Sequence, residues 1–261
     1  MIPKELLPLF PWFSGLLGLI LGSFYTVCVH RYLTGQSIVL PGSHCPQCGR
    51  KLKAWENIPL LSFLLLRGRC AGCKALISWR YPLMEAASCA WATALALHFG
   101  PGLAWIMLMA VGGVFLVASF IDLEIFILPD ILTYPGIVLG LATGVLALGL
   151  PATDSLIGAA AGAGLFWLLR FVHMRARGVE GLGLGDVKLM AMIGALTGWM
   201  GLPPAILFGA VSALALAPVF RMLAKGEDGP LRIPFGPFLC LGCMLALLWG
   251  EKFMLFLAGR L

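Results

Sequence analysis

Two aspartates lie at the ends of apolar segments, where a carboxylate is expensive to place unless it has a chemical task. Asp186 belongs to the glycine-rich turn Gly181–Lys188, and Asp122 closes an earlier apolar run. Aspartyl hydrolysis needs two carboxyl groups that share one proton over an attacking water. We therefore predict that Asp122 and Asp186 meet in the fold as a catalytic pair.

Two further acids are rivals for the upstream position in this pair. Glu124 lies two residues after Asp122 and faces another side of a helix. Asp130 follows Pro129 at a predicted helix start, where an acid is a good cap. Spacing alone leaves these rivals open, and it does not assign the acid and the base within the pair.

Four cysteines form two C-x-x-C pairs in the only sizeable polar region. Cys45 and Cys48 are separated from Cys70 and Cys73 by a spacer of 21 residues. Each pair can place two thiolates on a tight turn, and four thiolates complete the tetrahedral shell of zinc. The alternatives are two disulfides, which a reducing cytoplasm disfavours, or a redox dithiol, which needs only one pair. We predict a structural zinc site, with His44 as a neighbour rather than a ligand.

Membrane helices are the elements that must position these groups. The chain has 261 residues, of which 60% are hydrophobic and 11% charged, with a mean hydropathy of +0.96. A soluble core of this length cannot hide so much apolar surface, so we predict an all-α polytopic membrane protein with about eight transmembrane helices and a small cytoplasmic zinc-binding loop domain. The apolar runs fall near 9–30, 82–99, 102–121, 131–150, 155–173, 187–200, 202–220 and 237–257. The segment Gly201–Pro204 is expected to form the last outer hairpin.

Basic residues set the expected orientation. The net charge of +6 would suit nucleic acid, but 15 of the 18 Lys and Arg residues fall in the first long loop and in alternate later connections, so we expect no nucleic-acid partner. The positive-inside rule makes that side cytoplasmic, with both dyad aspartates facing it and both termini outside. We divide the chain into a first transmembrane helix (1–30), a cytoplasmic tetracysteine domain (31–81) and a seven-helix membrane domain that carries the dyad (82–261).

The loop between the cysteine pairs also holds an apolar segment. Residues 55–66 are rich in apolar side chains and are followed by Arg67 and Arg69. We expect this stretch to lie on the membrane surface, with the arginines toward lipid phosphates. Glu85, just inside the next apolar run, is expected to snorkel or to pair with a loop arginine rather than to catalyse.

In this order and company, these motifs resemble the type IV prepilin peptidase family over nearly the whole chain. The glycine-x-glycine-aspartate turn alone would be weak evidence, because presenilin-like proteases share it. The resemblance is carried by Leu21–Phe24, His30-Arg31, the Cys45 pair, Glu56–Pro59, Leu66–Cys70, the Cys70 pair, Arg80–Glu85, Asp122 to Leu128-Pro129-Asp130, Gly183–Asp186 and Pro234–Pro237.

The resemblance implies a bacterial inner-membrane aspartyl protease that cuts the basic leader from prepilins or pseudopilins after a glycine. It places the catalytic acids at Asp122 and Asp186, and zinc on the four cysteines. It further implies methylation of the new N-terminal amine with S-adenosylmethionine, a step tied to a glycine that corresponds to Gly68. The polar region is too small for a Rossmann unit that would bind this cofactor in a familiar way.

Two other classes of function compete with proteolysis. A proton-coupled carrier would relay protons through intramembrane acids, but it predicts acids at helix centres and paired repeats. A zinc-dependent membrane scaffold without chemistry would leave Asp122 and Asp186 without a task.

Overall fold

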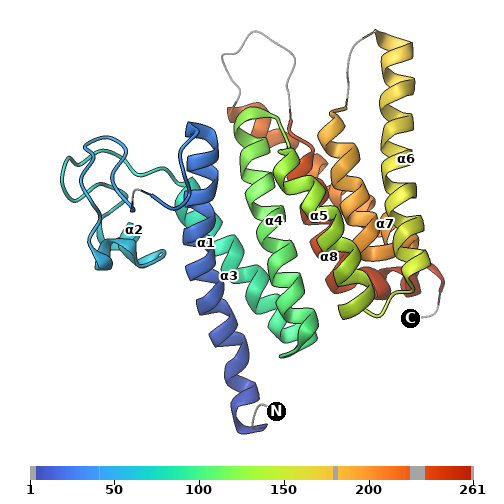
Figure 1. Cartoon of the computed structure of the whole chain (residues 1–261), viewed down its shortest axis with the longest axis horizontal. Coiled ribbons are helices and arrows are strands. Elements are labelled where there is room, and N and C mark those ends of the chain that lie inside the picture. The colour runs from blue at the N-terminus through green and yellow to red at the C-terminus, as the bar shows by residue number, and fades with distance from the viewer. Residues whose placement is uncertain (1–3, 41, 179–181, 224–232, 260–261) are drawn as a thin grey trace. The chain divides into compact units, whose positions relative to one another are not determined.

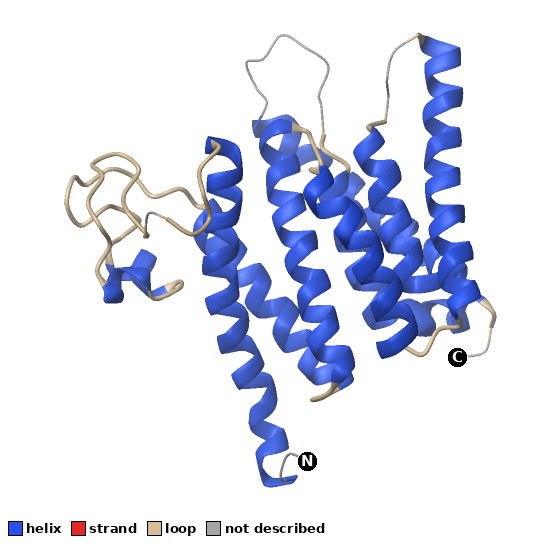
Figure 2. Ribbon diagram, viewed as in Figure 1, coloured by secondary structure: helices blue, strands red, loops and turns tan. Residues whose placement is uncertain are grey.

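The computed structural model describes residues 4–40, 42–178, 182–223 and 233–259, and within these ranges the chain is helical with no strand. Figure 2 shows the helices joined by loops. Gly181 of the predicted turn, and Lys225, Arg232 and Arg260 of the charge count, lie outside the described residues. The long helices are α1 (Phe10–Thr34), α3 (Arg80–Phe99), α4 (Leu103–Ile125), α5 (Asp130–Ala142), α6 (Ala152–Arg177), α7 (Leu184–Leu223) and α8 (Gly236–Leu257). The shorter ones are η1 (Lys4–Leu9), η2 (Ala54–Asn57), α2 (Leu61–Leu65) and the π-helical turn η3 (Thr143–Ala147).

Six helical segments among the described residues are long and apolar enough to cross a membrane, where the sequence predicts eight crossings. One difference is α3, which covers the run at 82–99 but also carries Arg80, Glu85 and His98 and is therefore less apolar. The other is α7, which counts once although its helical path breaks at Gly198 into two parts that correspond to the runs at 187–200 and 202–220. The all-helical polytopic fold class is confirmed.

The hairpin predicted at Gly201–Pro204 is wrong in position. The helical path of α7 breaks at Gly198, whose φ of 69° is readily adopted only by glycine. Pro203 and Pro204 instead lie inside the helical part that follows, near its start.

The compact unit Met1–Val117 contains α1, α3 and the cysteine loop. Small residues on α1 let the two helices approach closely. A Cβ on Gly18 would lie 2.6 Å from the Ser88 carbonyl oxygen, and one on Gly22 would lie 2.7 Å from the Glu85 Cα. The buried Ser14 hydroxyl donates to the Ala92 carbonyl at 2.7 Å. Backbone contact of this kind fixes the register of α1 on α3.

The compact unit Ala118–Leu261 contains the end of α4 and helices α5 to α8. Glycines bring α5 and α6 into backbone contact with α7. A Cβ on Gly140 of α5 would lie 2.8 Å from the Met192 carbonyl oxygen, and one on Gly158 of α6 would lie 2.6 Å from the Gly198 carbonyl carbon. The ends of α4 and α6 and the starts of α5 and α7 lie at the same end of this unit (Figure 1). Asp122 and Asp186 are therefore carried to one end of the helix bundle.

Candidate active site and cysteine cluster

Asp122 and Asp186 lie close enough to interact electrostatically. Asp122 is in the last turn of α4 and only 6% exposed, and Asp186 is half-buried in the first turn of α7. Each carboxylate accepts one backbone hydrogen bond. The Gly236 N–H donates to Asp122 Oδ2 at 3.1 Å, and the Gly183 N–H donates to Asp186 Oδ2 at 3.2 Å. The structure thus brings the two predicted aspartates together and orients each one.

Leu128 joins the three segments that build this site. The chain leaves α4 through Phe126, which has a left-handed φ of 56°, and then turns so that Leu128 is 94% buried. A Cβ on Gly185 would lie 2.8 Å from the Leu128 Cβ, and one on Gly236 would lie 3.2 Å from its Cδ atoms. The glycine before Asp186 and the first residue of α8 therefore both pack on one leucine that follows Asp122.

Gly236 is a site residue that the sequence analysis did not identify. The motif Pro234–Pro237 was expected only as part of a family pattern, yet its glycine supplies the N–H that binds Asp122. The available signal was the helix start itself, since the first N–H groups of a helix have no intrahelical acceptor and suit an anion.

The rival acid Asp130 lies differently from the pair. Asp130 is the first residue of α5, where Pro129 occupies the cap position without a side-chain hydrogen bond, so the predicted capping role is not observed. Its Oδ1 instead pairs with Lys188 Nζ at 2.5 Å, and its side chain is 63% exposed. Lys188 also lies 4.6 Å from the centre of the Tyr134 ring. The ion pair thus links the start of α5 to Lys188 of α7, which lies two residues after Asp186.

The four cysteine sulfurs gather in the first unit, all within 4.8 Å of one another. Two matched turns present them, with hydrogen bonds from the Gly49 N–H to the Cys45 carbonyl and from the Lys74 N–H to the Cys70 carbonyl. The Cys45 and Cys73 Sγ atoms are 3.9 Å apart. Zinc–sulfur bonds of about 2.3 Å in a tetrahedron require sulfurs about 3.8 Å apart, so these residues fit a zinc ion. His44 hydrogen-bonds Gly42 and is not a member of the cluster.

Backbone N–H groups favour a thiolate within this cluster. Those of Cys73 and Gly72 lower the pKa of the Cys70 thiol to about 6, whereas a hydrogen bond at Ala75 is outweighed by burial and the neighbouring cysteines, which raise the pKa of the Cys73 thiol to about 11. A cysteine must lose its proton to bind a metal, so a lowered pKa suits a ligand.

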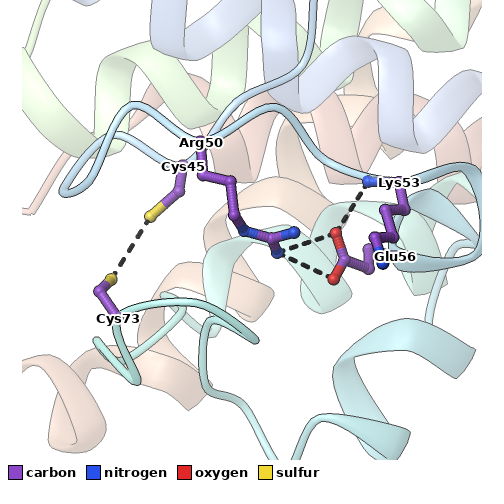
Figure 3. A network of polar contacts seen from close by, with 5 residues as sticks. All are labelled: Cys45, Arg50, Lys53, Glu56 and Cys73. Carbon is purple, nitrogen blue, oxygen red and sulfur yellow. Dashed lines mark hydrogen bonds and ion pairs between the residues drawn. The ribbon is translucent and has the colours of Figure 1, made fainter.

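An ion pair lies beside the cysteines, as Figure 3 shows. Arg50 Nη2 donates to Glu56 Oε1 at 2.8 Å and to Oε2 at 2.9 Å, and the Lys53 N–H also donates to Glu56. The Glu56 side chain is only 1% exposed, and its pKa is lowered by the hydrogen bond from Arg50. A Cβ on Gly72 would lie 3.0 Å from Arg50 Nε, so the guanidinium reaches from the first cysteine turn to the second.

Gly68 is buried in the turn between α2 and Cys70. Its φ of 66° is left-handed, and a Cβ there would lie 3.1 Å from the Phe63 ring. Its N–H donates to the Phe63 carbonyl and its carbonyl accepts from the Ile77 N–H. The residue is thus needed for the local backbone whatever else it does.

The prediction for Glu85 is wrong. The residue neither reaches the surface nor pairs with a loop arginine, because it is 93% buried and its Oε2 accepts the Leu60 N–H at 2.8 Å. The carboxylate instead ties the cysteine loop to α3.

Comparison with known proteins places both units in one family. Residues 16–99 match the model of the bacterial peptidase A24 N-terminal domain, and residues 108–218 match that of the type IV leader peptidase family. The prepilin leader peptidase/N-methyltransferase of Pseudomonas aeruginosa is 38% identical over 261 residues, covering 91% of this chain and 89% of that protein. The protein with the same name from Burkholderia pseudomallei is 38% identical over 274 residues, covering 95% and 88%. No solved structure matches. The chain therefore belongs to the type IV leader peptidase family.

Proposed function

We propose that this protein is a membrane aspartyl endopeptidase that removes the basic leader from type IV prepilins or pseudopilins after a glycine. The observation that carries the proposal is the meeting of Asp122 and Asp186 at one end of the second unit, each with a backbone donor. The names of its relatives, prepilin leader peptidase/N-methyltransferase, supply the substrate class. Neither the family nor the placement of the aspartates at helix ends supports a proton-coupled carrier.

The chemistry follows from two carboxyl groups that lie close enough to interact electrostatically. Repulsion between like charges favours a state in which only one is ionised. The ionised carboxylate removes a proton from water, and the protonated one donates to the oxygen of the scissile carbonyl. The Gly236 and Gly183 N–H groups hold the two side chains in orientation throughout.

The second activity in this proposal is methylation of the new N-terminal amine with S-adenosylmethionine, supported by the names of the relatives. Gly68 is proposed to serve this step within the cytoplasmic domain 31–81. Its buried turn leads directly to Cys70, so it acts at least by shaping the cysteine loop.

The zinc proposed for Cys45, Cys48, Cys70 and Cys73 would be structural. It would join the two turns of a loop that has little apolar core of its own.

The protein is proposed to be a multi-pass protein of the bacterial inner membrane, with both termini outside and the dyad in domain 82–261 facing the cytoplasm. The six candidate spans and the distribution of basic residues support this.

The test is cleavage of a prepilin by membranes that contain Asp122→Asn or Asp186→Asn. Each change removes an ionisable proton while keeping the side-chain volume, so each should abolish the mass loss of the substrate. Equal extraction and elution in detergent shows that the variants are folded. Full cleavage by either variant would refute the dyad.

Transfer of labelled methyl groups to a pre-cleaved pilin, measured in the same membranes, tests the second activity, and no transfer by the parent protein would restrict the function to proteolysis.

A further inference from the structure

We propose that the segment Leu60–Arg69, here called the α2 tip, is a lipid-binding element of the cytoplasmic leaflet. Its leucines enter the acyl region, and its arginines hold the phosphates of anionic headgroups. This interaction is separate from both proposed activities, and its test does not depend on them.

The α2 tip has one inward and one outward face. Phe63 is 91% buried, with its ring centre 4.8 Å from that of Trp79, and it covers Gly68. Leu61, Leu64 and Leu65 are 48%, 69% and 65% exposed. Positions separated by three and four residues lie on the same side of a helical turn, so the three leucines form a continuous outward apolar face.

A shared cavity and a hydrogen bond place this face beside the membrane helices of its own unit. Pro59, just before the tip, lines a cavity of about 290 Å³ together with Ile20 and Phe24 of α1. The Leu60 N–H binds the buried Glu85 carboxylate of α3. α1 continues for ten residues beyond Phe24, which is about 15 Å of helix. The tip therefore lies alongside the membrane helix rather than beyond its end, as the position of α2 beside α1 in Figure 1 also shows.

The charges at the tip indicate that the apolar face of the α2 tip contacts lipid. Arg67 and Arg69 are both exposed directly after the leucines. An apolar face followed by two cations matches acyl chains below a layer of phosphates. A prepilin leader, which is basic under the proposed function, would be repelled by the same arginines.

Fluorescence quenching in nanodiscs tests this placement on the full-length protein. A fluorescent amino acid is introduced at Leu64 or, as a reference, at the exposed Lys51 of the first cysteine turn. The lipids are phosphatidylglycerol and phosphatidylcholine with bromines near the headgroup end of the acyl chains. We expect quenching at position 64 to exceed that at position 51 severalfold, without any substrate present. Equal quenching at the two positions overturns the proposal, as does quenching at position 64 that changes only when a prepilin is added.

The role of the arginines is tested with the same probe. We expect quenching at position 64 to increase when phosphatidylglycerol replaces phosphatidylcholine, and this increase should disappear in the double variant Arg67→Gln, Arg69→Gln. Exchange of Lys51 and Lys53 for Gln removes the same charge from the same loop and serves as the matched control. An increase that is lost equally in both double variants would refute a specific contact of Arg67 and Arg69 with lipid phosphates.

Discussion

Replacement of Gly236 by alanine isolates the orientation of Asp122 from its chemistry. The Gly236 N–H lies 3.1 Å from Asp122 Oδ2, and an added Cβ would lie only 2.6 Å from the same oxygen. An ordinary contact begins near 3.4 Å, so the carboxylate must retreat by about 0.8 Å. Gly236 does not have a left-handed φ, so alanine itself fits the backbone. The change therefore moves a carboxylate that it does not remove.

The expected result is a large loss of activity with little loss of stability. A displacement near 1 Å at a reacting group lowers the rate about 100-fold, and a hydrogen bond to a charged acceptor contributes about 1.5–3 kcal/mol net. The displaced atom is the end of a side chain, and alanine is about 1 kcal/mol better than glycine within a helix, so the unfolding temperature should change by only a few degrees.

The assay is the rate of prepilin cleavage in detergent, measured with the thermal unfolding of the same sample. Gly164→Ala is the matched control, because a Cβ there meets no atom within 4 Å and the residue also lies in a helix of the second unit. We expect the Gly164 variant to cleave at the parent rate. Parent-level cleavage by Gly236→Ala would show that Asp122 is not held by this contact. Equal loss in both variants would show that the helices, not the site, are sensitive.

Further predictions concern the rival acid and the cysteine loop. Asp130→Asn should retain cleavage within about threefold, because its exposed ion pair contributes at most about 1 kcal/mol, and a loss comparable to that of a dyad variant would make Asp130 catalytic. Cys45→Ser should release bound zinc, measured by metal analysis of the purified protein, whereas Cys28→Ser, outside the cluster, should retain it. Glu56→Gln should speed zinc release to a chromogenic chelator at pH 7. Arg50 lowers the pKa of Glu56, so the ion pair is intact at neutral pH and is lost as the pH falls through that lowered value. The rates of zinc release of the variant and the parent should therefore become more similar at that low pH.

The sequence predicted the parts of the site that have a side-chain signature. A glycine turn before Asp186 and an acid at the end of another apolar run indicated the pair, and the family resemblance selected Asp122 over Glu124 and Asp130. The order of helices carries both aspartates to one end. The spacing of the cysteines likewise predicted their cluster. These features depend on residue type and local geometry, which a single chain displays.

The contacts that the sequence did not predict involve backbone groups from distant segments. The Gly236 N–H reaches Asp122 across 114 positions, and the Leu60 N–H reaches Glu85 across 25. Every residue except proline has such a donor, so composition and periodicity do not indicate which one meets an acid. The break in α7 was misplaced for a related reason. Two adjacent prolines suggested a turn, but the left-handed φ is at Gly198, and both prolines lie inside the helical part that follows.

The close glycine contacts along α7 limit how a pilin can reach the dyad from within the bilayer. A helix with its side chains is about 10–12 Å wide. Between α5 and α7, and between α6 and α7, backbone atoms meet at positions where even a methyl group would not fit, including Gly140 and Gly158. Lateral passage of a substrate helix along either seam would require these helices to separate completely. The apolar helix of a pilin must therefore approach Asp186 from another side of α7, while α5 and α6 remain packed against α7.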